Sequence, residues 1–189
     1  MLNVVIIDYG SGNLRSAQKA FERSASFIKQ KVTVSVSRKA EDLKKASHIV
    51  LPGVGAFSDC LDGLESIPEM IEALRFQVLA VGKPFLGICV GMQLLGDKSW
   101  ENGVTRGLGW IAGDVIKLEN LEKSLKVPHM GWNNILIRKK NHPLMRGLNS
   151  GDHAYFVHSF HFENLEQKNC YATVHYGRKI SAIVGRDNI

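Results

Sequence analysis

Short apolar runs alternate with amphipathic segments through the first half of the chain. Residues 4–7 form an uninterrupted β-branched run, which predicts a strand buried on both faces. From Leu14 to Ile28 the apolar residues recur with helical spacing, which predicts a helix. The same alternation then predicts strands at 32–36, 48–51 and 83–88, a short helix at 41–46, a helical stretch over 59–81 divided near Pro68, and a helix beginning at Val90.

Strands that alternate with helices in this way predict a parallel sheet with helices on both faces. After about Gly103 the pattern changes to short strands with little helix between them, which we expect at 110–118, 134–137, 154–157, 171–175 and 180–184. We therefore expect an α/β fold. Its mostly parallel central sheet would continue as a mixed or antiparallel C-terminal extension, within one domain spanning residues 1–189.

The composition is that of an ordinary folded domain. A chain of 189 residues with 44% hydrophobic content is long enough for one core and short for two. Its first residues indicate a strand and not a leader peptide, and no apolar stretch approaches the roughly 20 residues needed to cross a bilayer. We expect a cytoplasmic protein with no membrane partner.

Cysteine usage and charge bear on cofactors and partners. Cys60, Cys89 and Cys170 lie far apart and form no CxxC pair, which argues against a disulfide framework or a zinc site. The net charge of +6 comes from scattered basic residues, whose clusters at 44–45 and 138–140 are not interleaved with aromatics. A nucleic-acid footprint needs a concentrated basic patch. We expect no metal, no cofactor and no nucleic-acid partner.

Residues 87–91 (Gly-Ile-Cys-Val-Gly) place Cys89 where a predicted strand turns into a helix. This is the G-x-nucleophile-x-G elbow, in which we expect the two glycines to remove Cβ clashes with an outward-pointing nucleophile. The dipole of the following helix would favour the thiolate, and the Val90 N–H is placed to bind an oxyanion. The alternative is a core cysteine whose flanking glycines only allow close packing.

A second glycine-rich segment, residues 51–55 (Leu-Pro-Gly-Val-Gly), ends another predicted strand. Parallel strands deliver their carboxyl ends to one edge of a sheet, so this backbone could offer a further N–H to the same oxyanion. A simple glycine turn is the alternative. Cys60 and Cys170 are not flanked by such glycines at a strand-to-helix turn, and we expect them to be inert.

Five segments in consistent order resemble the class I (triad) glutamine amidotransferases. They are DYGSGNLRS at 8–16, LPGVGAF at 51–57, GICVGMQLL at 87–95, KVPHMGWN at 126–133 and YFVHS at 155–159. The resemblance runs along the whole chain and implies that family's three-layer fold. Within the family it implies an enzyme, a glutaminase subunit that supplies ammonia for making imidazole glycerol phosphate in histidine biosynthesis.

The resemblance also implies residue roles. Cys89 would attack the side-chain amide of glutamine, release ammonia and form a γ-glutamyl thioester, which water cleaves to glutamate. The oxyanion would be held by the N–H of Val90, with that of Val54 or Gly55 after the loop rearranges. The residues that match glutamine-binding positions are Gln93, Glu101, His158, Ser159 and Phe160. Each also has a plain structural explanation, such as a hydrogen-bonded strand histidine for His158.

A partner is implied as well: a (β/α)₈ cyclase in a heterodimer. The glutaminase would be nearly inactive until that synthase has bound its ligand. The segments that resemble the partner-facing side contain Asn13, His129, Trp132 and Tyr155, although core packing explains such residues equally well. Two other functions stay open. One is an inactive scaffold subunit that only binds the synthase, and the other is a glutaminase that serves a different synthase.

One part of the family's pattern is not found in residues 1–189. The histidine base and its acidic partner belong to a Phe-His-Pro-Glu-type segment, whereas His142-Pro143 is followed here by Leu144. Loss of the base would lower the rate by roughly 10²–10⁴ or more. Three explanations are open: a sequence truncated at its C-terminus, an inactive subunit, or another histidine as the base, with His158 the nearest candidate.

Overall fold

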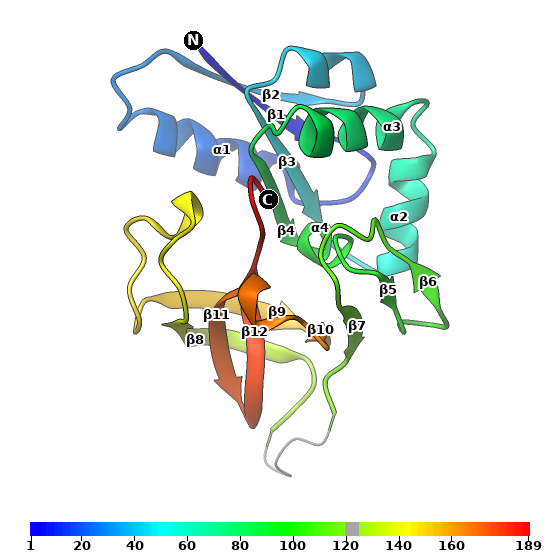
Figure 1. The fold of residues 1–189 in the computed structure, drawn as a ribbon, viewed down its shortest axis with the longest axis vertical. Helices are drawn as coiled ribbons and strands as arrows, with labels where there is room; N and C mark the ends of the chain where they lie inside the picture. Colours follow the sequence, from blue (N-terminus) through cyan, green and yellow to red (C-terminus); the bar gives the residue numbers. More distant parts are fainter. Residues whose placement is uncertain (120–124) are drawn as a thin grey trace. The chain divides into compact units, whose positions relative to one another are not determined.

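The computed structural model describes residues 1–119 and 125–189, which form two compact units (Figure 1). The first unit contains Met1–Leu94 with Asn188–Ile189, and the second contains Leu95–Asp187. The expectation of a single domain stays a prediction.

A four-stranded parallel sheet forms the centre of the first unit. Its strand order is β2-β1-β3-β4, and every neighbouring pair is parallel, as the sequence predicts. The strands are β1 (Leu2–Ile7), β2 (Val32–Ser37), β3 (His48–Gly53) and β4 (Phe85–Cys89). The middle strands β1 and β3 are the apolar ones because both of their faces are buried.

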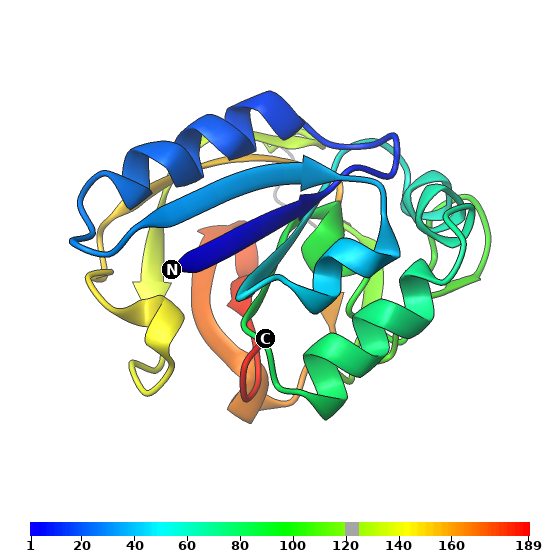
Figure 2. The ribbon, with the colours of Figure 1, turned by 90° about the horizontal axis from the view of Figure 1, so that it is seen from above.

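Helices cover both faces of this sheet (Figure 2). On one face, Leu14 and Phe21 of α1 (Leu14–Ala25) pack against Val4 and Ile6 of β1. The other face carries the 3-10 helix η1 (Ala40–Lys44), α2 (Phe57–Glu65), α3 (Met70–Leu74) and its continuation as the π-helix η2 (Arg75–Ala80). The predicted division near Pro68 is confirmed, because α2 ends before it and α3 begins after it.

The second unit contains two four-stranded sheets, with strand orders β10-β7-β5-β6 and β12-β11-β8-β9. Among their strand pairs only β5 and β7 run parallel, so the mixed and antiparallel character is confirmed. We expect these strands to extend the parallel sheet, and this part of the prediction is wrong. Among the described residues they form two sheets of their own. The strands are β5 (Lys98–Ser99), β6 (Thr105–Arg106), β7 (Asp114–Lys117), β8 (His129–Ile137), β9 (His153–His158), β10 (Phe160–Glu163), β11 (Cys170–Tyr176) and β12 (Arg178–Val184), and the 3-10 helices η3 (Pro143–Met145) and η4 (Gln167–Asn169) lie between them.

Two strand predictions in this unit are partly wrong. The strand predicted over 110–118 begins only at Asp114, because the N–H groups of Trp110 and Ile111 both donate to the Leu95 carbonyl. In the other direction, β8 extends beyond the predicted 134–137 and starts at His129. The strands β5, β6 and β10, each of which has four residues or fewer, were not predicted.

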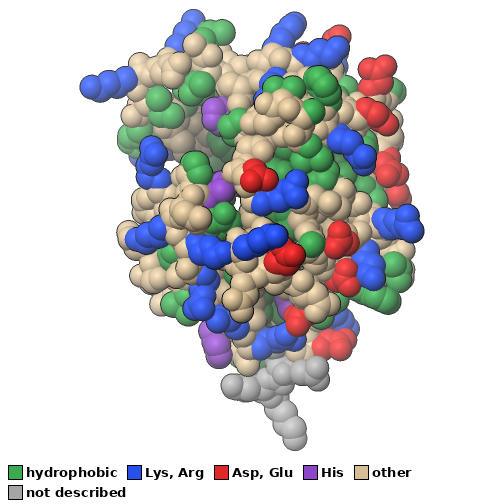
Figure 3. Space-filling model, viewed as in Figure 1, with side chains coloured by type: hydrophobic (Ala, Val, Ile, Leu, Met, Phe, Trp, Pro, Cys, Tyr) green, Lys and Arg blue, Asp and Glu red, His purple; other side chains and the backbone are tan. Residues whose placement is uncertain are grey.

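None of the helices in the described residues is long and apolar enough to cross a membrane. Figure 3 shows Lys and Arg side chains at many separate places on the face that it draws, whereas the acidic side chains lie in its centre and toward its right-hand side.

Candidate active site

Cys89 is the last residue of β4 and directly precedes the short helix α4 (Val90–Gln93). Its backbone has φ 56° and ψ −116°, a conformation that non-glycine residues rarely adopt. The residue is exposed to solvent. The predicted elbow is therefore present: a strained turn from strand to helix with an accessible cysteine at its tip.

The glycines on either side of Cys89 are required by backbone packing. A Cβ on Gly87 would lie 2.5 Å from the carbonyl oxygen of Gly91, and one on Gly91 would lie 1.8 Å from that of Leu51. They let α4 pack directly on β4 and on β3. This corrects our explanation that they avoid a clash with the nucleophile itself.

The thiol of Cys89 is not poised as a thiolate. Although the residue is exposed, desolvation by the protein around its sulfur raises the pKa of the thiol, and a hydrogen bond from the Val90 N–H offsets only part of that rise. The expected help from a helix dipole is small because α4 has four residues. The resting group is a thiol, which needs a base before it can act as a nucleophile.

The segment 52–55, made of the last two residues of β3 and the two that follow, lies beside the elbow because Gly53 is the register partner of Cys89. We call it the oxyanion loop. Its Val54 N–H donates to the Ser11 hydroxyl oxygen at 3.0 Å, and the same hydroxyl donates to the Val54 carbonyl at 2.5 Å. Gly55 has φ 95° and open space where a Cβ would be. In this conformation the Val54 N–H is bound to Ser11.

Two more side chains hold the oxyanion loop. The buried thiol of Cys60, from α2, donates to the Val54 carbonyl at 3.3 Å and lies 3.2 Å from the Ser11 hydroxyl. The Tyr9 hydroxyl donates to the Pro52 carbonyl at 2.5 Å. Sequence reasoning missed Ser11 and Tyr9, and took Cys60 to be inert. The one available signal was that Ser11 and Tyr9 belong to the family-like segment 8–16.

The two units hold different parts of the predicted site. The first unit brings together Cys89, Val90, the oxyanion loop and Gln93, whose side chain is buried in α4. Glu101 lies in the second unit after β5, where its N–H donates to the Ser99 hydroxyl at 3.1 Å.

Ser159 occupies a corner between two sheets of the second unit. The strand β9 ends at His158 and β10 begins at Phe160, and these strands belong to different sheets. The Ser159 carbonyl accepts a hydrogen bond from the Leu118 N–H at 2.8 Å. A hollow of about 440 Å³ is lined by Trp100, Asn102, Ile116, Lys117, Glu119 and Phe160, and so adjoins the sequence neighbours of Glu101.

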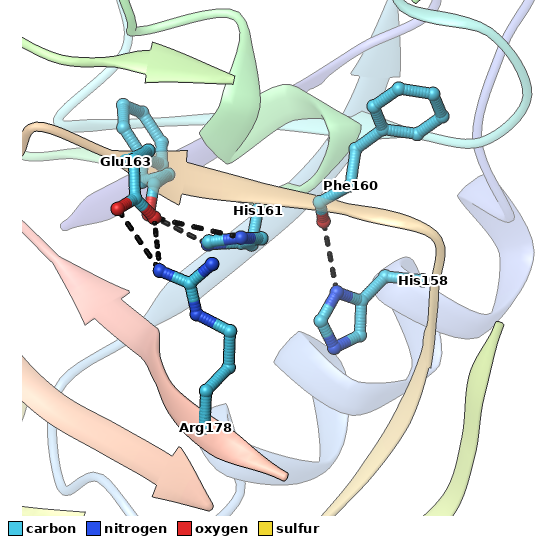
Figure 4. A network of polar contacts seen from close by, with 6 residues as sticks. His158, Phe160, His161, Glu163 and Arg178 are labelled. Carbon is cyan, nitrogen blue, oxygen red and sulfur yellow. Dashed lines mark hydrogen bonds and ion pairs between the residues drawn. The ribbon is translucent and has the colours of Figure 1, made fainter. Parts of the chain in front are cut away.

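Both ring nitrogens of His158 have partners inside the protein. Nδ1 lies 2.9 Å from the Phe160 carbonyl oxygen (Figure 4), and Nε2 lies 3.0 Å from Nδ1 of His129. Burial lowers the pKa of His158 below its usual value. In this arrangement His158 has no nitrogen left for a substrate or for a proton from Cys89.

The far end of β10 is held by an ion pair. Nη2 of Arg178 donates to both carboxylate oxygens of Glu163, at 3.0 and 2.9 Å (Figure 4). The neighbouring His161 is buried, and its Nδ1 lies 2.8 Å from the Phe162 carbonyl oxygen. No group of three or more His, Cys, Asp or Glu side chains suited to a metal ion occurs in the described part of the chain.

The four residues predicted to face a partner differ in exposure. Trp132 and Tyr155 are register partners on β8 and β9, are 72% and 55% exposed, and form a T-shaped ring contact at 5.5 Å. Asn13 is exposed, and its side chain caps α1 by accepting from the Ser16 N–H. His129 is only 2% exposed, so its side chain does not face outward as expected.

Comparisons with known proteins agree with this geometry. Residues 5–189 match the family model described as glutamine amidotransferase class-I. The chain is 49% identical over 191 residues to the imidazole glycerol phosphate synthase subunit HisH of Brucella suis biovar 1 (strain 1330), and 47% identical over 188 residues to that of Rhodospirillum rubrum. Each alignment covers 100% of this chain and 88% of the relative. A solved structure described as a glutamine amidotransferase matches with a TM-score of 0.61 at 18% identity, over 92% of this chain and 85% of that one, which supports the fold.

Proposed function

The chain belongs to the class I glutamine amidotransferases, and from this premise we propose that it hydrolyses glutamine and passes the ammonia to a synthase that makes imidazole glycerol phosphate. The observation that carries the proposal is the exposed Cys89 on a strained elbow, with Gly53 of the oxyanion loop as its register partner. The names of the relatives, each a subunit of that synthase, support the choice of reaction and of a partner subunit.

The proposed chemistry begins with attack of the Cys89 sulfur on the side-chain amide carbon of glutamine. The tetrahedral oxyanion is held by the N–H of Val90 together with that of Val54 or Gly55. The proton that the Cys89 thiol loses is transferred to the amide nitrogen. Collapse then breaks the carbon–nitrogen bond, ammonia leaves, and a γ-glutamyl thioester remains. Water then cleaves the thioester, which gives glutamate and the free thiol.

The resting oxyanion loop supports a regulated enzyme. Because the Val54 N–H is bound to the Ser11 hydroxyl, it becomes available to an oxyanion only after the loop rearranges. We propose that the partner synthase, a (β/α)₈ cyclase docked against Trp132, Tyr155 and the Asn13 region, drives that change. By the same resemblance, Gln93 in the first unit and Glu101, Ser159 and Phe160 in the second are proposed to contact glutamine.

The test is a glutaminase assay on the full-length gene product, purified with its synthase partner and supplied with the synthase substrate. Cys89→Ser should abolish glutamate release while leaving the complex intact. The matched control Cys170→Ser, whose thiol is bonded to the Ala172 carbonyl and the Ser181 hydroxyl, should stay active.

Normal glutamate release by Cys89→Ser would overturn the proposal. An intact complex with no glutamate release from the wild type, and no labelling of Cys89 by a glutamine-like electrophile, would support an inactive scaffold instead. Co-purification with a different synthase would assign the ammonia to another pathway.

A further inference from the structure

The corner at Ser159 is fixed by a chain of hydrogen bonds whose direction can be worked out. The Phe160 carbonyl can only accept, so Nδ1 of His158 carries the proton and donates to it at 2.9 Å. Nε2 of a neutral His158 is then an acceptor, so Nδ1 of His129 must carry a proton and donate to it at 3.0 Å. Nε2 of His129 is left as the acceptor for the Asn133 side-chain amide at 3.3 Å.

The surroundings of His129 keep the imidazole rings of His129 and His158 neutral and in place. Its ring is stacked on Tyr176 with centroids 4.0 Å apart and on Phe156 with centroids 4.8 Å apart. Burial, with a smaller contribution from His158, lowers the pKa of His129 to about 4. The Asn133 amide also donates to the His175 carbonyl at 3.0 Å, which fixes its orientation toward the ring.

These contacts act on Ser159, the one residue between β9 and β10, which belong to different sheets. His129 and His158 are register partners on β8 and β9, and the His158 ring reaches past Ser159 to the carbonyl of Phe160. At the other end of β10, Arg178 holds Glu163. The backbone at Ser159 and Phe160 is therefore held on both sides by directional polar contacts.

We propose that His129 and His158 are positioning residues for glutamine: the donor chain from His129 Nδ1 through His158 to the Phe160 carbonyl holds Ser159 and Phe160 in the conformation that binds the substrate. This inference rests on the proposed function. It replaces the expectations that His158 contacts glutamine itself and that His129 contacts the partner.

Two variants of His129 separate the donor from the packing. His129→Phe keeps an aromatic ring between Tyr176 and Phe156 but removes the N–H. His129→Asn removes the ring but places an amide N–H near the position of Nδ1. If the donor positions the corner, His129→Phe should raise KM for glutamine about tenfold with kcat within about twofold, and His129→Asn should keep KM within about threefold of wild type.

The variant with the higher KM should be the more stable of the two. His129→Asn loses the stacked ring and should have the lower melting temperature, whereas His129→Phe should have the higher KM. The assays use the full-length gene product in complex with its synthase. If the less stable variant, His129→Asn, has the higher KM, or if neither variant changes KM, the positioning role is overturned.

A spectroscopic measurement tests the chain without relying on activity. Long-range ¹H–¹⁵N correlation of the wild-type protein at neutral pH should show both His129 and His158 as the Nδ1–H tautomer. Finding the Nε2–H tautomer at His158 would overturn the proposal even if the variants fail to fold. A wild-type complex that releases no glutamate would instead refute the proposed function, whatever the tautomers are.

Discussion

The Ser11 hydroxyl and the Val54 backbone bind each other in both directions. The hydroxyl oxygen accepts from the Val54 N–H at 3.0 Å and the hydroxyl hydrogen is donated to the Val54 carbonyl at 2.5 Å. A side chain from the loop after β1 thus holds the residue after β3 through both of its backbone polar groups. If Val54 supplies an oxyanion donor, Ser11 competes with the oxyanion for that N–H.

Ser11→Ala should therefore raise glutaminase activity in the absence of the synthase substrate. Removing the hydroxyl removes both hydrogen bonds between Ser11 and Val54, which favour the resting loop. A net loss of about 1 kcal/mol for the resting conformation corresponds to roughly a fivefold rise in the unstimulated rate. The activity of the fully stimulated complex should change less. The measurement is glutamate release with and without the synthase substrate.

Ser11→Thr provides the matched control because it keeps a hydroxyl on the same atom. It should retain the low unstimulated rate of the wild type. Equal unstimulated rates in wild type, Ser11→Ala and Ser11→Thr would show that the Ser11 contact does not limit the resting enzyme.

Gly91→Ala should destabilise the protein by about 3 kcal/mol or more. The new Cβ would lie 1.8 Å from the Leu51 carbonyl oxygen, and neither α4 nor β3 can move without disturbing the elbow. Gly82→Ala is the control for backbone strain alone, because Gly82 has φ 79° and open space around it, and should cost about 1–2 kcal/mol. Similar urea midpoints for the two variants would contradict the packing explanation.

The protein should lose stability as the pH falls from about 6.5 toward 4. The pKa of His129 is about 4 in the folded chain, below its unfolded value of roughly 6.5, so in this range the unfolded chain binds more protons. The stability contributed by a neutral His129 is fully present above pH of about 6.5 and declines on acidification. Urea midpoints measured between pH 7.5 and 5 should show it.

His129→Phe should have a shallower decline than the wild type over the same pH range, because one of the histidines whose pKa is lowered by burial is removed. The control His153→Gln, at an exposed position on β9, should keep the wild-type dependence. Identical pH dependence in wild type and His129→Phe would show that His129 does not carry this effect.

Trp132→Ala should weaken the complex with the synthase by at least about tenfold. Trp132 is 72% exposed beside Tyr155, so its loss should change the free energy of unfolding by no more than about 0.5 kcal/mol. Phe76→Ala is the control, since Phe76 is 59% exposed on η2 of the first unit. Titration calorimetry with the synthase should distinguish them, and equal affinities would argue against a partner surface at Trp132.

The strands and helices of the first unit were predictable because each has a local signal. β1 and β3 are apolar runs flanked by turn residues, and α1 shows helical spacing from Leu14. The very short strands β5 and β6 have no such signal, since two residues cannot display a period. The length of β8 was missed because its first residues include a glycine and polar side chains, and its pairing with β9 holds them in the sheet.

The sequence by itself determined the α/β fold class, the family and the position of Cys89 at an elbow, because periodicity and a motif are local properties of neighbouring residues. Only the tertiary structure decided which groups are already engaged: that Val54 is bound to Ser11, that His129 is buried, and that both nitrogens of His158 are occupied. Hydrogen bonds and burial depend on residues that are distant along the chain. No local pattern encodes which of them meet when the chain folds.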